Sequence, residues 1–402
     1  MLERIDAAPK DAILGLTEAF KADPRAEKIN LSVGVYQDET GKTPLLECVR
    51  EAERRLAATT TTKSYLPIAG LGEYCQAVAE LAFGPQSPAL AERRVAWAQT
   101  PGGTGALRVA ADFIHHSLPQ ATVWLSEPTW PNHPQIFQAA GVPTRTYAYF
   151  DKQHNGLDLP GLLTAVESMA AGDVMLLHGC CHNPTGIDPT PDQWRQIAEA
   201  VVARGVLPLV DFAYQGFADG VDQDAAGLRE LAAAGSELLA CSSFSKNFSL
   251  YRERVGALFA LAPTAATAAA VQSQFERAIR ANYSNPPAHG AEVVATILRD
   301  AALRQQWDGE VAAMRERING MRTALVAALT RHGVPGDYSF IARQRGMFSF
   351  SGLTKEQVAA LQTEHAIYAV GSGRINVAGL TPANVDRVAE CIGAVVGQPV
   401  RA

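Results

Sequence analysis

Short runs of apolar residues alternate with longer stretches of helical periodicity through the middle of the chain. Six of the runs predict buried strands, because they are continuously apolar and end at polar or turn residues. They are VAWAQT (95–100), TVWLSEP (122–128), DVMLLHG (173–179), VLPLVDF (206–212), LLACSSF (238–244) and VGALFAL (255–261). The stretches GALRVAADFIHH (105–116) and DQWRQIAEAVVAR (192–204) are typical of amphipathic helices. This alternation predicts an α/β fold with a mainly parallel sheet, in which ligands bind at the carboxyl ends of the strands.

The pattern changes after Pro286-Pro287, where apolar residues recur every three or four positions and predict one long helix ending near Gly333. The stripe is formed by Leu303, Trp307, Val311, Met314, Ile318, Met321, Leu325 and Leu329. Beyond it, a short strand in MFSFSGL (347–353) and further helices predict a smaller α+β unit. The first residues have no core of their own. We therefore predict an N-terminal segment (1–45) that packs with a small C-terminal domain (313–402), and a large domain (46–312) between them.

Composition narrows the class of protein without identifying it. The chain has 402 residues, of which 47% are hydrophobic and 19% charged, so it can bury a large interior. A net charge of −6 and the lack of a basic block argue against nucleic-acid binding. No apolar run is long enough to cross a bilayer, and MLERIDAAPK lacks the apolar core of a secretory signal. Six widely spaced cysteines without C-x-x-C spacing indicate reduced, mostly buried thiols in a cytoplasmic protein, with no metal site.

Two ionisable residues follow predicted strands. Lys246 comes after two serines and before Arg252 and Arg254. Burial beside a cation lowers the pKa of a lysine and makes its amine nucleophilic, whereas an exposed loop lysine would be inert. Asp211 ends VLPLVD, where it either caps a local turn or holds a proton on a ligand nitrogen. His133 and His178, near the same strand ends, are either partners of Asp211 or ordinary core groups.

Each of the remaining candidate site residues has two interpretations, one functional and one structural. Gly102-Gly103-Thr104-Gly105 either exposes backbone N–H groups to an anion at a helix N-terminus or forms a plain turn capped by Thr104. Arg280 and Arg374 either clamp a dicarboxylate or form surface ion pairs. Trp130 either stacks on a flat ring or packs in the core.

Several segments, taken together, resemble the class I aminotransferases, and among them the bacterial aspartate and aromatic enzymes. They are CCHNPTG (180–186), DFAYQGF (211–217), SFSKNF (243–248), RERVG (252–256), YSNPP (283–287) and GRINVAG (373–379), in this order. The resemblance extends from AAPKDAILGL (7–16) to the C-terminal helix. It implies fold type I of the pyridoxal phosphate (PLP)-dependent transferases: a large PLP-binding domain with a mainly parallel seven-stranded sheet, and a smaller α+β domain. It also implies a homodimer whose two active sites are shared between subunits.

The resemblance further implies a role for each motif residue. Lys246 would bond to PLP and then move the substrate proton, Asp211 would pair with the pyridine nitrogen, and Tyr214 and Asn183 would bind the ring oxygen. Trp130 would stack on the ring. The phosphate would be bound by Gly103, Thr104, Ser243, Ser245 and Arg254, together with Tyr65 of the partner subunit. The substrate would meet Gly34, Trp130, Asn183, Arg374 at its α-carboxylate, and Arg280 of the partner subunit at a distal carboxylate.

Pocket residues bear on the choice of substrate. Four of them resemble the aspartate type: Val35, Thr43, Thr104 and Asn285. Gln37 and Ser64 resemble neither type, and SFSKNFSLY leans toward the aromatic one. We therefore expect amino transfer from L-aspartate to 2-oxoglutarate by a ping-pong reaction on PLP, with some activity on aromatic amino acids. The alternative is an enzyme that acts mainly on tyrosine and phenylalanine.

Two other classes compete with this interpretation. A PLP-dependent decarboxylase or β-eliminating enzyme would share Lys246 and Asp211 but has little use for Arg280. A regulator with the same fold, without catalysis, would carry a DNA-binding segment before the family pattern. We expect no such segment, because the pattern begins within the first ten residues.

Overall fold

The computed structural model describes residues 1–7, 12–235 and 237–397. Part of the segment AAPKDAILGL therefore lies outside the described residues. The chain divides into two compact units: unit 1 comprises 1–43, 184–186 and 317–402, and unit 2 comprises 44–183 and 187–316. Among the described residues, no helix combines the length and the apolar character needed to span a bilayer.

Unit 2 is built on a seven-stranded sheet, counted over the described residues, with the order β2-β10-β9-β8-β7-β3-β4. Its strands are β2 (Val95–Pro101), β3 (Val123–Glu127), β4 (Thr144–Ala148), β7 (Val174–His178), β8 (Leu207–Phe212), β9 (Leu238–Ser243) and β10 (Val255–Leu261). Only β10 runs antiparallel to its neighbours, within the part of the sheet that the structure describes. All six predicted strands are confirmed to within two residues at each end. A two-stranded hairpin, β5 (Phe150–Asp151) and β6 (Gly156–Leu157), follows β4.

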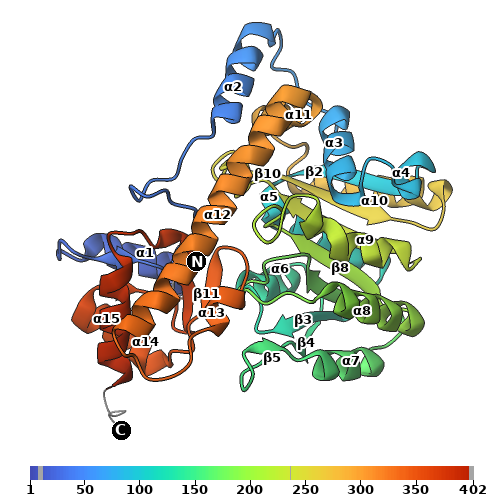
Figure 1. Ribbon diagram of the computed structural model, residues 1–402. Helices are drawn as coiled ribbons and strands as arrows, with labels where there is room; N and C mark the ends of the chain where they lie inside the picture. Colours follow the sequence, from blue (N-terminus) through green and yellow to red (C-terminus); the bar gives the residue numbers. More distant parts are fainter. Residues whose placement is uncertain (8–11, 236, 398–402) are drawn as a thin grey trace. The chain divides into compact units, whose positions relative to one another are not determined.

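Helices cover both faces of this sheet (Figure 1). Helices α5, α6 and α10 pack together on one face, and α7, α8, α9 and α3 form the layer on the other. The bounds are α2 (Glu47–Thr59), α3 (Gly72–Phe83), α4 (Pro88–Ala91), α5 (Gly102–Ser117), α6 (Asn132–Ala139), α7 (Leu159–Ser168), α8 (Pro191–Arg204), η2 (Gln223–Ala225), α9 (Ala226–Ala233), α10 (Ala265–Asn282) and α11 (His289–Arg299). Local sequence explains the sharp ends of α8: Thr190 and Gln193 form a capping box, and Gly205 ends the helix in the left-handed conformation.

Helix α12 (Ala301–Arg331) contains residues of both units and confirms the predicted long helix. Seven of the eight stripe residues are buried, and Met321 is half-buried. A continuous apolar stripe of this kind stabilises a long helix mainly through packing, since propensity alone contributes little.

Within its described residues, unit 1 contains two small sheets. In the first, β1 (Ile29–Asn30) runs parallel to β12 (Ile367–Tyr368), and in the second β11 (Phe348–Phe350) runs antiparallel to β13 (Arg374–Asn376). The other elements are η1 (Leu2–Arg4), α1 (Ala12–Ala22), α13 (Phe340–Arg343), α14 (Lys355–His365), η3 (Val377–Gly379) and α15 (Val385–Val396). The β1–β12 pairing joins the N-terminal part of the chain to its C-terminal part.

Candidate functional site

The carboxyl ends of β7, β8 and β9 lie side by side in unit 2 and bring the first site residues together. His178 on β7 pairs in register with Asp211 on β8, and Asp211 pairs with Cys241 on β9. Ser243 ends β9 two residues further on, and Lys246 follows in the next turn. Parallel strands place their carboxyl ends at one edge, which is why residues that are distant in sequence meet here.

Asp211 is a buried carboxylate with a defined hydrogen-bond partner. Its Oδ2 lies 3.0 Å from His133 Nε2 on α6, so the imidazole donates and the carboxylate accepts. Burial alone would raise the pKa of Asp211, but the hydrogen bond from His133 is the largest of several influences that outweigh burial, and the pKa is lowered. Asp211 therefore stays ionised at the edge of the sheet. It is not a helix cap, because it belongs to β8.

A chain of hydrogen bonds continues from Asp211 through His133 to Thr129 and His178. Thr129 Oγ1 lies 2.8 Å from His133 Nδ1 and 3.2 Å from His178 Nε2, and the backbone N–H of Asn183 donates to His178 Nδ1 at 3.4 Å. One proton arrangement satisfies every bond: His178 donates to Thr129, Thr129 donates to His133, and His133 donates to Asp211. His178 is neutral in it, in agreement with burial lowering its pKa to about 3.

Lys246 is half-buried, and its Nζ lies 4.9 Å from the centre of the Tyr214 ring. Loss of solvent around the amine lowers its pKa to about 8 from an ordinary 10.5; the charge of Asp211 opposes this shift, and that of Arg254 adds to it. An amine with this pKa has an appreciable neutral fraction at pH 7 and can act as a nucleophile and as a base.

Two serine hydroxyls and a guanidinium lie together close to the lysine. Ser243 Oγ lies 3.3 Å from Ser245 Oγ, which accepts a hydrogen bond from Arg254 Nη1 at 3.3 Å. The backbone of α5 approaches this group closely, since a Cβ added to Gly103 would lie 3.0 Å from Ser243 Cβ. Helix α5 begins at Gly102, so Thr104 lies in its first turn and is not the capping residue. Hydroxyls, a guanidinium and a helix N-terminus together suit a phosphate.

Trp130 follows β3 with its indole edge-on to the His133 ring at 5.2 Å, and it is partly buried against the core of unit 2. Trp130 thus takes part in core packing, and its stacking on a flat ring stays a prediction. Asn183 and Tyr214 are both buried, and Tyr214 lies two residues after the end of β8. Unit 2 contains ten of the predicted site residues: Gly103, Thr104, Trp130, Asn183, Asp211, Tyr214, Ser243, Ser245, Lys246 and Arg254.

Two predicted substrate residues lie in unit 1. Arg374 begins β13 and is 2% exposed, so it is no surface ion-pair residue. Its Nη2 donates to the carbonyl of Ser32 at 2.7 Å. Gly34 lies two residues after that carbonyl, which places the N-terminal segment and the arginine together within the unit.

The last two predicted residues are exposed on unit 2. The Tyr65 side chain is 91% exposed. Arg280 lies in the last turn of α10 and is exposed, with Nη1 donating to Ser284 Oγ at 2.5 Å.

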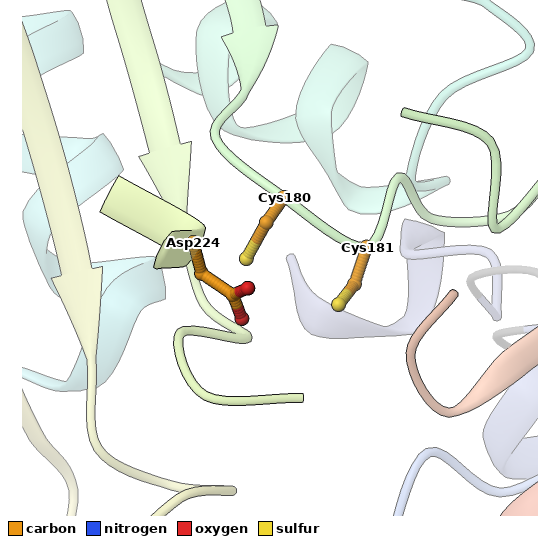
Figure 2. A group of neighbouring side chains, drawn as sticks. All are labelled: Cys180, Cys181 and Asp224. Atoms are coloured by element: carbon orange, nitrogen blue, oxygen red, sulfur yellow. The ribbon is translucent and has the colours of Figure 1, made fainter. Parts of the chain in front are cut away.

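Figure 2 shows a further group, in which the side chains of Cys180, Cys181 and Asp224 converge. Their potential ligand atoms lie within 4.8 Å of one another. Both oxygens of Asp224 already accept backbone N–H groups, from Gly216 and Ala218 at Oδ2 and from Asp219 and Gly220 at Oδ1. Burial raises the pKa of the Cys180 thiol, which disfavours the thiolate that binds metals. Asp224 therefore stabilises the turn after β8.

Sequence reasoning missed Thr129, although it named its neighbour Trp130. The hydroxyl of Thr129 connects two histidines from different elements, and no local pattern reports such a contact. Its position directly after a buried strand was the one available signal.

Comparison with known proteins agrees with this geometry. The family model for aminotransferase class I and II matches residues 26–392. An aspartate aminotransferase of Salmonella typhi is 54% identical over 98% of this chain and all of its own length. An aromatic-amino-acid aminotransferase of Pseudomonas aeruginosa is 50% identical, with 98% of each chain covered. The crystal structure of an aromatic-amino-acid aminotransferase from Burkholderia pseudomallei, covalently bound to pyridoxal phosphate, matches with a TM-score of 0.96 at 48% identity, covering 98% of this chain and 99% of that one. The chain belongs to the class I and II aminotransferases.

Proposed function

We propose that this protein is an aspartate aminotransferase, which moves the amino group of L-aspartate to 2-oxoglutarate and also accepts aromatic amino acids. The observation that carries the proposal is the Lys246 amine, with its pKa lowered to about 8 beside the charges of Asp211 and Arg254. The names of the relatives at 54% identity support aspartate as the preferred substrate. Val35, Thr43, Thr104 and Asn285 support it as well.

Class I aminotransferases use pyridoxal phosphate, and the residues present fit this cofactor. The cradle of Ser243, Ser245, Arg254 and the first turn of α5, with Gly103 and Thr104, would bind its phosphate. Asp211, kept ionised by His133, would accept a hydrogen bond from a protonated ring nitrogen. Tyr214 and Asn183 would bind the ring oxygen, and Trp130 would cover the ring face. Each group is of the chemical type that its counterpart on the cofactor requires.

The chain's own residues carry the steps around the substrate. When bound, pyridoxal phosphate withdraws electrons and so stabilises negative charge at the substrate Cα. Lys246 removes the Cα proton, for which a base with a pKa near the working pH is well matched. Arg374 binds the α-carboxylate, with Gly34 beside it, and a second arginine, Arg280 of the partner subunit, binds the distal carboxylate of aspartate. Arginine suits both positions because its planar fork matches a carboxylate.

The proposal includes a homodimer in the cytoplasm, with Tyr65 and Arg280 acting in the active site of the partner subunit. The exposure of both side chains supports it, as do the exposed apolar residues Met1, Leu2 and Ile5. The six cysteines, free and buried, support a reducing compartment. We also propose that 1–45 and 313–402 act as the small domain and 46–312 as the large one.

The absorption spectrum of the purified protein with PLP tests the proposal. We expect a cofactor band that shifts when L-aspartate is added and returns with 2-oxoglutarate, with kcat/KM for aspartate above that for phenylalanine. The reverse order of kcat/KM would make the protein an aromatic aminotransferase. Release of CO₂ or ammonia without a keto-acid acceptor would contradict transamination.

The variant Lys246→Ala tests the role of the lysine itself. It should still bind PLP, because the phosphate cradle does not include the amine, and it should lose turnover by several orders of magnitude. Normal turnover in Lys246→Ala would remove this residue from the mechanism.

A further inference from the structure

The closest cation–π contact among the described residues lies within unit 1. The guanidinium carbon of Arg374 is 4.1 Å from the centre of the Phe348 ring, whereas the other such contacts measure 4.9 to 5.5 Å. Strand register explains the contact. Phe350 on β11 pairs with Arg374 on β13. Phe348 is therefore the diagonal neighbour of Arg374, on the same face of the two-stranded sheet.

The same ring also contacts the N-terminal segment 31–35. A Cβ added to Gly34 would lie 3.0 Å from Phe348 Cζ, so a larger residue at this position would force the ring or the segment to move. The segment is bound to β13 by Arg374 Nη2, which donates to Ser32 O at 2.7 Å, and by Asn376 Nδ2, which donates to Val33 O at 2.6 Å and to Val35 O at 2.9 Å. The phenyl ring thus contacts both Gly34 and the guanidinium.

The backbone that carries the ring is itself fixed by a buried arginine. Arg322 on α12 is 1% exposed, and its Nη2 donates to the carbonyls of Gly346 and Phe348, at 2.6 Å each. Its Nη1 donates to the carbonyl of Ile341 at 3.3 Å. Charged donors on backbone carbonyls are strong hydrogen bonds, so Phe348 has little freedom to move away from Arg374.

We infer that Phe348 is a positioning residue for Arg374. The Phe348 ring holds the guanidinium in the orientation that binds the substrate α-carboxylate. The inference rests on the proposed function of Arg374. Arginine has a long, flexible side chain, and a ring against its face together with the bond to Ser32 restricts its rotation before the substrate arrives. The α-carboxylate is present in the substrate and in the transition state alike, so the loss of this restriction weakens both equally. The effect should therefore appear in KM and leave kcat nearly unchanged.

The test measures KM for the variant Phe348→Leu in the PLP-loaded protein. Leucine keeps an apolar side chain but has no ring face, and we expect KM for aspartate and for phenylalanine to rise together, roughly 3- to 30-fold. Phe20→Leu is the matched control, because Phe20 also lies under a cation in unit 1, Lys28 at 4.9 Å, but does not contact Arg374. It should leave KM unchanged.

A double-mutant cycle with Arg374→Lys separates positioning from a general loss of structure. If Phe348 acts through the guanidinium, Phe348→Leu should add little to the KM increase already caused by Arg374→Lys. An equal increase in both backgrounds would overturn the inference, and so would a fall in kcat at unchanged KM.

Calorimetric titration with 2-methylaspartate gives a readout that does not depend on turnover, because this compound has no Cα proton to remove. Its dissociation constant should rise in Phe348→Leu by the same factor as KM, and an unchanged constant would overturn the inference. If the unsubstituted protein binds 2-methylaspartate but does not transaminate aspartate, the proposed function fails while this titration still decides the role of Phe348.

Discussion

Three influences act on the Lys246 amine, and their balance gives it a pKa suited to covalent chemistry. Loss of solvent is the largest and lowers the pKa, Asp211 raises it, and Arg254 lowers it again. The outcome is a pKa of about 8 against 10.5 for an ordinary lysine. At neutral pH this difference increases the neutral, nucleophilic fraction of the amine roughly 300-fold.

The rate of cofactor uptake should reveal this pKa. In the cofactor-free protein we expect the rate constant for covalent uptake of PLP to rise about tenfold per pH unit below pH 8 and to level off above it. The sign follows from the neutral amine being the reactive form. Pyridoxal has no phosphate to titrate, and its rate constant should show the same dependence on pH. Lys246→Ala should show no covalent uptake. A rise that continues to pH 10 would mean that the amine is not perturbed.

Motif residues were predictable from the sequence, but the contacts that tune them were not. Asp211 and Lys246 stand out because each follows an apolar strand, and strand ends are where ligands bind. Thr129 and Phe348 show no such signal, because the first acts through histidines on two other elements and the second through a neighbouring strand. The two interpretations of His133 were settled by one distance to Asp211, which only the tertiary structure supplies.

The hydrophobic pattern predicts the strands best where every residue of the strand is buried. Strands β7, β9 and β10 are buried along their whole length, and a continuous apolar run is a strong signal. Strand β4 (Thr144–Ala148) was not among the six runs, because it lies at the edge of the sheet and four of its five residues are exposed. An edge strand needs few apolar residues, so its sequence resembles a loop.

Strand β10 lies close to the proposed phosphate cradle, because Gly256 has no side chain. A Cβ on Gly256 would lie 2.5 Å from the backbone carbon of Gly102, where α5 begins. Gly256→Ala should therefore displace the first turn of α5. We expect the unfolding free energy to fall by about 1–3 kcal/mol, and PLP affinity to fall at least tenfold.

Urea unfolding and PLP titration of the cofactor-free protein measure these two effects. Gly309→Ala on α12 is the control, since nothing lies within 4 Å of its Cβ position and it should be neutral or slightly stabilising. If Gly256→Ala binds PLP as tightly as the unsubstituted protein, the close approach of β10 and α5 is not needed for the cradle.

For the whole molecule, two arrangements of the active site are conceivable: Arg280 acts either in the site of its own chain or in that of the partner subunit. The side chain is exposed at the end of α10 and contacts Ser284 of its own chain. Tyr65 is exposed as well, at 91%. A dimer that exchanges both residues between subunits would bury them and would give each site parts of two chains.

Mixing two inactive variants decides whether the sites are shared. Chains with Lys246→Ala have no base, and chains with Arg280→Ala lack the distal clamp for aspartate. In a mixed dimer with shared sites, the Arg280→Ala chain keeps its own Lys246 and receives an intact Arg280 from its partner, so one site of the two is complete. Random reassociation makes half of the dimers mixed, and aspartate turnover should recover to about a quarter of the unsubstituted value. If Arg280 instead served the site of its own chain, no combination would contain a complete site and mixing would restore nothing.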